Sequence, residues 1–363
     1  MLLTVGLGTA GAVVFLEILV RVVRPFDWDP AMFTTHPRRG EFYSPNYRGS
    51  FRGVPVWTDE FGQRIPTQYP RPFDPGKKDA PLLIAFGDSF TFGDDWPVED
   101  SYVEQFRRLS RDRGTPWQVM NAGVCGYGPL KVADYIGEAV PRWKPKVAVF
   151  QFFLGNDLIP QIDPARRGLF YRVFLKTIRD NFLLYRVGLD IWLGGPDSMT
   201  AAWLRKKTGW PKERVSLFKT RKSKVETLQE IRRLHEPMIQ EWKKQGLGWL
   251  QYREAVRRAA NGCRDHSTQM IGLILPLNLD PSLRADSWDK TLTYQEVWEA
   301  VGPLYVALEE EFEAAGIPVL NMLKNWATRN KTLGDLDENG KGHFGPLKNR
   351  LIAEEILRSF GKP

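Results

Sequence analysis

The chain has 363 residues, of which 42% are hydrophobic and 13 are tryptophan, so a globally disordered protein is excluded and a large core is available. The net charge of +8 is moderate, and no recognisable nucleic-acid-binding module accompanies it. Two cysteines, Cys125 and Cys263, exclude a disulfide framework, and four histidines with no pair at ligand spacing argue against a metal site. We therefore expect no cofactor, no metal and no nucleic-acid partner.

Residues 1–24 are predicted to form an uncleaved transmembrane anchor. The stretch is apolar up to Leu16, and a helix over residues 2–23 just spans a hydrocarbon core of about 30 Å. Glu17 and Arg21 interrupt it at a spacing that allows them to pair. No small-residue cleavage site follows, which favours an anchor over a signal peptide. A buried or interfacial helix is the alternative, because Glu17 is costly in lipid.

Residues 25–80 are rich in proline, arginine and aromatic residues and show little periodicity. This composition predicts an extended collar rather than a domain. Within it, Thr58 to Arg64 is predicted to be a turn between two extended pieces.

From residue 81 onward, strand-like and helix-like patterns alternate. We predict strands near 82–86, 117–121, 147–153, 269–276 and 317–320, and helices near 98–113, 129–142, 294–315 and 346–360. The alternation predicts an α/β domain over residues 81–363, built on a mostly parallel five-stranded sheet with both faces covered.

The interval from about 160 to 266 departs from this alternation and is predicted to be an inserted helical cap. Lysine and arginine far outnumber acidic residues between Trp203 and His266, and tryptophans including Trp210, Trp242 and Trp249 are interleaved. One interpretation is a surface for anionic lipid, an acidic polymer or a membrane-protein partner. The other is a solvated basic face whose tryptophans pack on the main domain.

Four short motifs lie at the ends of predicted strands or in loops. Gly87-Asp88-Ser89 ends the first strand, a glycine-rich stretch containing Gly126 follows the second, Asn156 follows the third, and His343 precedes the last helix. Open α/β sheets bind ligands at the carboxyl ends of their strands. A serine on such a strand-to-helix turn suits a nucleophile that must stabilise an anion. The alternative for Ser89 is a helix-capping or phosphate-binding serine.

In this order, Ser89, Gly126, Asn156 and His343 resemble the four motif blocks of the SGNH/GDSL hydrolase family, in its membrane-anchored bacterial form, over roughly residues 40–363. The resemblance implies a flavodoxin-like three-layer sandwich. It implies that Ser89 is the nucleophile and His343 its base. It also implies an oxyanion hole made by the backbone amides of Ser89 and Gly126 and the side chain of Asn156.

One departure from the family concerns the acid that orients the histidine. The family commonly places an acid two or three residues before the histidine, where this chain has Lys341 and Gly340. Asp337 is the candidate, reaching the imidazole by a turn through Asn339 and Gly340. A Ser-His dyad, a displaced acid and an inactive relative all stay open, since loss of the orienting acid can cost a triad about 10⁴ in rate.

These observations predict a membrane-anchored serine esterase that acts on O-acyl esters of a glycan or lipid. The alternatives are an acyltransferase of a polysaccharide O-acylation system, and a catalytically silent subunit docked on a membrane complex through its anchor and basic cap. We predict an extracytoplasmic, periplasmic globular domain, the placement that the resembled family favours. The basic residues Arg21, Arg24, Arg38 and Arg39 all follow the anchor, which by the positive-inside tendency favours the opposite orientation.

Overall fold

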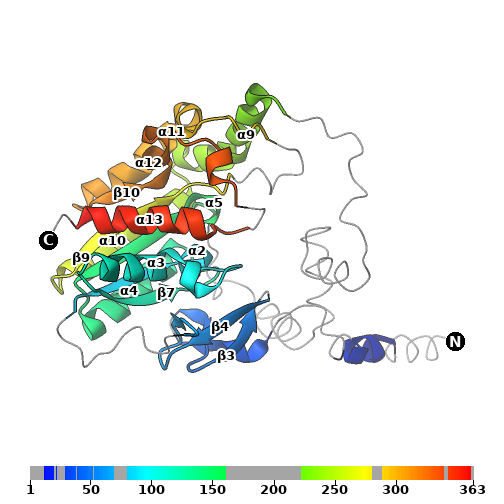
Figure 1. The fold of residues 1–363 in the computed structure, drawn as a ribbon, viewed down its shortest axis with the longest axis vertical. Helices are drawn as coiled ribbons and strands as arrows, with labels where there is room; N and C mark the ends of the chain where they lie inside the picture. The colour runs from blue at the N-terminus through cyan, green and yellow to red at the C-terminus, as the bar shows by residue number, and fades with distance from the viewer. Residues whose placement is uncertain are drawn as a thin grey trace. The chain divides into compact units, whose positions relative to one another are not determined.

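The computed structural model describes residues 12–19, 22, 29–37, 39–51, 53–68, 80–160, 222–279, 288–338 and 342–360 (Figure 1). The chain divides into two units. One consists of Met1–Pro30, Ser50–Gly53 and Ile162–Phe218, and the other of Ala31–Gly49, Val54–Gln161 and Lys219–Pro363. The second unit contains every motif residue singled out above.

In the first unit, residues 12–19 and 22 are helical. No helix within the described residues is both long enough and apolar enough to cross a membrane. The rest of the predicted anchor lies outside the described residues. The same holds for residues 161–221 of the predicted cap, including Trp203 and Trp210.

Five parallel strands form the centre of the sheet, at the positions that the sequence predicts. In spatial order they are β7 (Gln118–Gly123), β6 (Leu82–Gly87), β8 (Val147–Phe153), β9 (Gln269–Leu275) and β10 (Val319–Asn321). Counted along the chain this is the order 2-1-3-4-5 of flavodoxin-like folds, whose ligand crevice lies where the direction of strand addition reverses. Here that point lies between β6 and β8. The strands are mostly apolar, as expected for a parallel sheet whose two faces are both covered by helices.

The sheet has eight strands, so the prediction of five is wrong. Beyond β7 the order continues with β5 (Arg64–Ile65), β4 (Val54–Thr58) and β3 (Arg48–Phe51), and β5 runs antiparallel to β7. These strands come from the predicted collar. Its extended segments join the sheet because the open edge of β7 offers unpaired backbone groups that they can pair with. The predicted turn between Thr58 and Arg64 is confirmed as the connection from β4 to β5. A separate hairpin pairs β1 (Phe33–His36) with β2 (Gly40–Tyr43).

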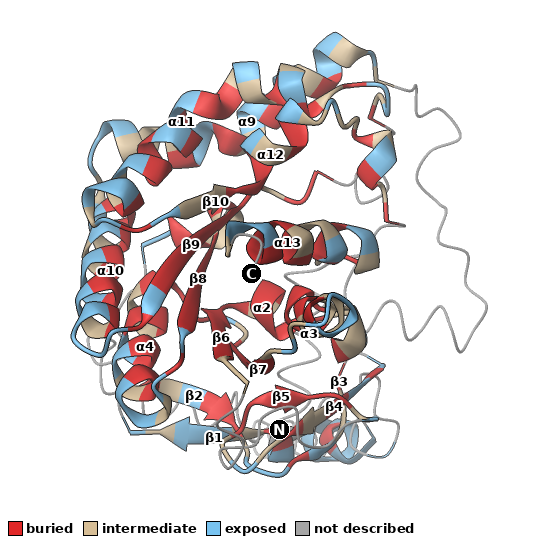
Figure 2. Cartoon of the chain, turned by 60° about the vertical axis from the view of Figure 1, so that its left-hand side comes forward, coloured by how far each residue is buried: buried red, intermediate tan, exposed pale blue. Residues whose placement is uncertain are grey.

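Helices cover both faces of the sheet, and all four predicted helices are confirmed (Figure 2). On one face, α3 (Tyr102–Asp112) packs against α13 (Pro346–Ser359). On the other, α4 (Pro129–Trp143) packs against α10 (Leu247–Arg264), and α11 (Tyr294–Ala314) packs beside α10. The helix α12 (Met322–Thr328) packs on α11. Shorter helical turns are η1 (Pro30–Met32), α2 (Ser89–Phe92), η2 (Val98–Asp100), α5 (Leu154–Asp157) and η7 (Gly334–Leu336).

The described part of the predicted cap, residues 222–266, belongs to the main domain. It forms α9 (Lys224–Lys243), which packs on α11, and α10, which packs on α4 and β9. A parallel connection from β8 to β9 needs a crossover helix, and α10 supplies it. Trp249 is buried, with its ring 5.6 Å from that of Tyr252. For Trp249, the packed-tryptophan interpretation is therefore correct.

Candidate active site

Ser89 begins α2 directly after the buried strand β6. Asp88 caps this short helix, because its Oδ1 accepts a hydrogen bond from the Phe90 amide at 2.9 Å. The Gly93 and Asp94 amides then donate to the Ser89 carbonyl at 2.9 and 3.0 Å, which closes the turn. Ser89 is thereby held at the carboxyl end of a central strand, beside the reversal point of the sheet.

The nucleophile turn rests directly on the end of β7. A Cβ atom at Gly123 would lie 2.1 Å from the Phe92 backbone nitrogen, so only glycine permits this approach. Asn121 braces the same junction: its Nδ2 donates to the Thr91 carbonyl at 2.8 Å, and its Oδ1 accepts from the Gly123 amide at 3.1 Å. Gly123 thus has a packing role, which agrees with the choice of Gly126 as the oxyanion candidate.

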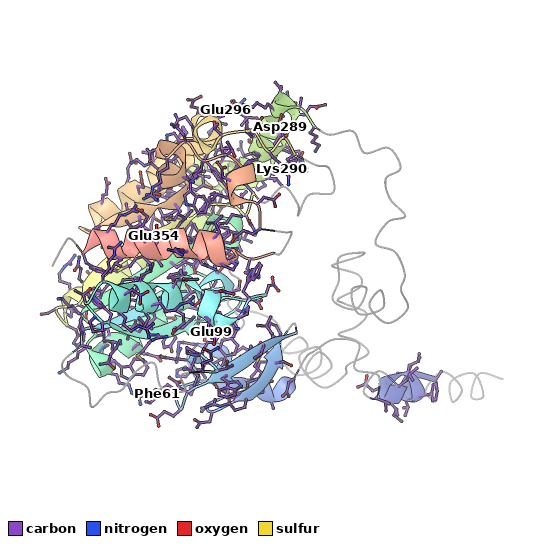
Figure 3. All side chains as sticks on the ribbon, viewed as in Figure 1. Phe61, Glu99, Asp289, Lys290, Glu296 and Glu354 are labelled. Carbon is purple, nitrogen blue, oxygen red and sulfur yellow. The ribbon has the colours of Figure 1, made fainter. Side chains whose placement is uncertain are left out.

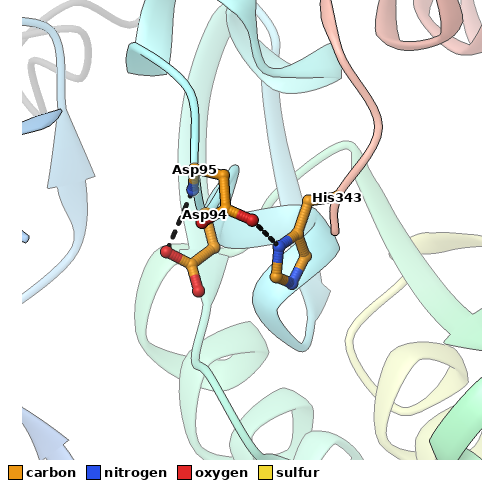
Figure 4. Close-up of side chains that lie close together, drawn as sticks. All are labelled: Asp94, Asp95 and His343. Atoms are coloured by element: carbon orange, nitrogen blue, oxygen red, sulfur yellow. Dashed lines mark hydrogen bonds and ion pairs between the residues drawn. The ribbon is translucent and has the colours of Figure 1, made fainter. Parts of the chain in front are cut away.

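His343 lies between the serine and a carboxylate. Its Nε2 is 2.8 Å from Ser89 Oγ, and its Nδ1 is 2.7 Å from Asp95 Oδ2. The side chains of His343 and Asp95 are 14% and 18% exposed, so the pair is largely shielded from water. Figure 4 shows the Asp95 carboxylate pointing at the imidazole, with Asp94 alongside. The expected contact between Ser89 and His343 is present.

This arrangement fixes the direction of proton movement. A carboxylate at Nδ1 favours the tautomer with its proton on Nδ1, which leaves Nε2 as an acceptor for the serine proton. Serine becomes an effective nucleophile when a base so placed removes its proton, and the carboxylate stabilises the imidazolium that forms. Ser89, His343 and Asp95 can therefore act as a nucleophile, a base and an orienting acid.

The assignment of Asp337 as the orienting acid is not supported by the structure. Its carboxylate forms an ion pair with Lys290, which Figure 3 labels, and the carboxylate bonded to His343 is that of Asp95. Left-handed backbone at Gly93 (φ +80°) and Asp95 (φ +68°) turns the chain back beside α2. The two adjacent acids Asp94 and Asp95, directly after the apolar nucleophile segment, are the signal that sequence analysis missed.

Side chains from three separate parts of the chain, two loops and α13, hold the loop that carries His343. Each donates to one backbone carbonyl: Asn278 Nδ2 to Gly342 at 3.1 Å, Trp96 Nε1 to His343 at 3.2 Å, and Asn349 Nδ2 to Phe344 at 2.8 Å. The Glu338 carboxylate accepts from the Gly345 amide at 2.9 Å and caps the start of α13. The imidazole is thus positioned by its backbone as well as by Asp95.

Gly126 lies in a tight turn joined to the nucleophile strand. The Tyr127 amide donates to the Val124 carbonyl at 3.0 Å, and Gly126 has the φ of +76° that favours glycine. The Val124 amide donates to the Gly87 carbonyl at 3.0 Å, which ties the turn to the end of β6. The structure therefore brings the Gly126 turn to the strand end that precedes Ser89.

Asn156 reaches the nucleophile turn from α5, at the end of β8. Its Nδ2 donates to Asp88 Oδ2 at 3.2 Å. Because an amide group carries two N–H donors, this bond fixes the side chain and leaves a second donor. The strand ends on either side of β6 thus bring both predicted oxyanion residues to the Ser89 turn.

Two buried acids lie beneath this region. Burial raises the pKa of Asp88, against the opposing effect of its hydrogen bonds from Phe90 and Asn156. Burial raises the pKa of Asp157 well above its usual range, and the nearby Asp88 raises it further. Asp157 Oδ2 accepts from the Phe153 amide at 2.7 Å. These effects make Asp157 the member of the pair that holds a proton most strongly.

The contacts or exposure of the other three histidines give no sign of a role at Ser89. His36 lies 3.5 Å from Glu138, and His266 is exposed. His235 is buried, with its ring nitrogens bonded to the Ile231 carbonyl and the Tyr305 hydroxyl, and burial lowers its pKa to about 4. His343 is therefore the histidine that serves Ser89.

Asp94, Asp95 and His343 could in principle supply ligand atoms to a metal ion, since these atoms lie within 4.8 Å of one another. Both ring nitrogens of His343 are, however, already engaged with Ser89 and Asp95. Two carboxylates with one engaged imidazole fit a proton relay better than a metal centre.

No family model matches the chain, and no curated protein matches it in sequence. Solved structures to which the chain is similar include a putative lipolytic protein of the G-D-S-L family from Desulfitobacterium hafniense DCB-2, with 13% identity and a TM-score of 0.38, over 76% of this chain and 98% of that one. The esterase EstA from Pseudoalteromonas sp. has 8% identity and a TM-score of 0.37, over 77% and 96%. An acetylxylan esterase, Axe2, from Geobacillus stearothermophilus has 10% identity and a TM-score of 0.41, over 78% and 95%.

Proposed function

We propose that this protein is a serine hydrolase of carboxylic esters. The observation that carries the proposal is the continuous hydrogen-bonded chain from Ser89 Oγ through His343 to Asp95, with distances of 2.8 and 2.7 Å. A capping or phosphate-binding serine has no need of an imidazole base with its own carboxylate. A catalytically silent subunit was favoured by the absence of an acid at the family's usual position before the histidine. Asp95 now supplies an acid to His343, so this argument for a silent subunit no longer holds.

The reaction follows from these positions. His343 Nε2 takes the proton of Ser89 as Oγ attacks the ester carbonyl carbon, which gives a tetrahedral oxyanion. The intermediate collapses as the protonated imidazole gives its proton to the departing alcohol, which leaves an acyl group on Ser89. Water then attacks this acyl-enzyme with His343 again as base, and release of the acid restores Ser89.

The oxyanion would be stabilised by the amides of Ser89 and Gly126 and by the second N–H of Asn156. Preorganised donors of this kind are often the largest catalytic term, and loss of one costs about 3 kcal/mol in a well-studied protease. The hydrogen bond from Asn156 to Asp88 supports the proposal, because it holds the amide in place before the substrate binds.

We assign the substrate class on the motif resemblance: an O-acyl ester carried by a glycan or lipid. The chemistry would serve acyl transfer equally well, since a sugar hydroxyl in place of water would take the acyl group from Ser89. The proposal also includes attachment to a membrane by residues 1–24 and a membrane-protein partner for the predicted basic cap.

A fluorophosphonate probe tests the nucleophile, because it reacts covalently with activated serines. The wild type should be labelled and should hydrolyse p-nitrophenyl acetate, whereas Ser89→Ala should do neither. Asp337→Asn is the matched control and should behave like the wild type. Labelling that persists in Ser89→Ala, or a folded wild type that is neither labelled nor active, would refute the proposal. An acetylated oligosaccharide, with and without an acceptor sugar, then separates hydrolysis from transfer.

A further inference from the structure

Arg64 lies on β5, one of the three strands that extend the sheet beyond β7, and it is only 2% exposed. Its guanidinium donates to four backbone carbonyls: Nη1 to Phe92 at 2.9 Å and Gly93 at 2.6 Å, and Nη2 to Trp96 at 2.9 Å and Pro55 at 3.3 Å. The guanidinium carbon also lies 4.6 Å from the centre of the Phe92 ring. Three of these four carbonyls belong to the segment 92–96.

Segment 92–96 contains the two residues that hold His343 from this side. Asp95 bonds the imidazole, and Trp96 donates to the His343 carbonyl. Asp95 has a left-handed backbone, which costs energy for a residue other than glycine and persists only where the surroundings enforce it. The carbonyls that Arg64 binds lie on both sides of this strained residue.

The chemistry of arginine suits this task. Its planar group presents five N–H donors in a fixed fork, whereas lysine offers a single charged point on a flexible stem. Burial lowers the pKa of Arg64, and the nearby Asp94 carboxylate acts in the opposite direction. A change to lysine therefore keeps the charge beside Asp94 and removes the fork.

We propose that Arg64 is a positioning residue for the orienting acid: it fixes the turn 92–96 so that Asp95 and Trp96 together hold His343 against Ser89. The inference rests on the proposed ester hydrolysis and extends it. It assigns a role in the reaction to a strand outside the five-stranded parallel core.

A double-mutant cycle with Arg64→Lys and Asp95→Asn tests this role in the full-length protein. Arg64→Lys should lower kcat by about 10- to 100-fold, the scale of a misplaced catalytic group, and leave KM within about twofold. In the Asp95→Asn background it should have little further effect, because the residue through which Arg64 acts is already lost. Equal effects in both backgrounds would overturn the inference, since they indicate general damage.

Arg48→Lys is the matched control. Arg48 lies on β3, another of the three added strands, and also donates to backbone carbonyls, those of Tyr47 and Thr58. It should keep a wild-type kcat. A fall in kcat equal to that of Arg64→Lys would assign the effect to loss of the added strands and would contradict the inference. Arg64→Gln serves as a second variant if Arg64→Lys does not fold.

A spectroscopic measurement separates this inference from the proposed function. The proton shared by His343 Nδ1 and Asp95 should give a low-field proton resonance, assigned by its loss in Asp95→Asn. The resonance should be lost or shifted in Arg64→Lys and retained in Arg48→Lys, whether or not the protein hydrolyses esters. An inactive wild type with this pattern refutes the function and keeps the positioning role. An unchanged resonance in Arg64→Lys refutes the positioning role.

Discussion

The two sides of Ser89 differ in how completely their polar groups are paired. On the side that handles the proton, both ring nitrogens of His343 and its backbone carbonyl have partners. On the side proposed to hold the oxyanion, two buried atoms have no hydrogen-bond partner within the described residues: Asn156 Oδ1 and Asp157 Oδ1. Burial also raises the pKa values of Asp88 and Asp157 on this side.

The difference separates two physical requirements. The proton side must hold a base and an acid in one geometry before the substrate arrives, and both ring nitrogens of His343 are accordingly bonded. The oxyanion side keeps buried polar groups that are costly to leave unpaired, and such costs concentrate at functional sites. The following variants test whether this contrast is catalytic, from the largest expected effect to the smallest.

Asp95→Asn should give the largest effect. The amide cannot stabilise the imidazolium and favours the wrong tautomer, so kcat should fall by roughly 10⁴-fold. Asp337→Asn removes the carboxylate that pairs with Lys290 and should leave kcat near that of the wild type, because the carboxylate bonded to His343 is that of Asp95. Steady-state kinetics on p-nitrophenyl acetate provides the comparison. A larger loss in Asp337→Asn than in Asp95→Asn would return the role of orienting acid to Asp337.

Asn156→Ala tests the oxyanion side and should lower kcat by about 10²- to 10³-fold with little change in KM, because the donor acts mainly in the transition state. Asn261→Ala removes an exposed amide on α10 and serves as the control. If Asn156→Ala retains wild-type kcat, Asn156 only caps a turn, and the contrast between the two sides has no catalytic meaning.

Asp157→Asn should change stability more than rate. The pKa of Asp157 is raised in the folded protein, so folding favours its protonated form. Stability therefore falls as the pH rises from the ordinary carboxyl value of 3.8 through the folded value, and the deficit persists above it. The amide has no such penalty and can still accept from the Phe153 amide.

The variant should consequently unfold at higher urea than the wild type at pH 8, and its advantage should shrink as the pH falls toward 4. Urea unfolding curves across this range measure the effect, with Asp134→Asn as a control for loss of an exposed carboxylate. An advantage that grows toward low pH would show that the sign is wrong.

The sequence by itself determined the parallel core and the meeting of Ser89 with His343. Five apolar runs and four periodic segments specify strands and helices locally, and parallel strands bring their carboxyl ends to one edge. Gly345 and Pro346 likewise mark the start of α13, because the ring of proline suits the first turn of a helix. These signals lie within the segments that they describe.

Only the tertiary structure decided the orienting acid, the eight-stranded sheet and the role of Arg64. Asp95 reaches His343 through a left-handed turn that Arg64 holds from β5, and no local pattern encodes such a long-range contact. The strands β3 to β5 have only two to five residues each, and they join the sheet because β5 pairs at the edge of β7. Asp337 follows the family spacing more closely than Asp95 does, yet its carboxylate pairs with Lys290, because the path of the backbone, not distance along the chain, determines which acid reaches the imidazole.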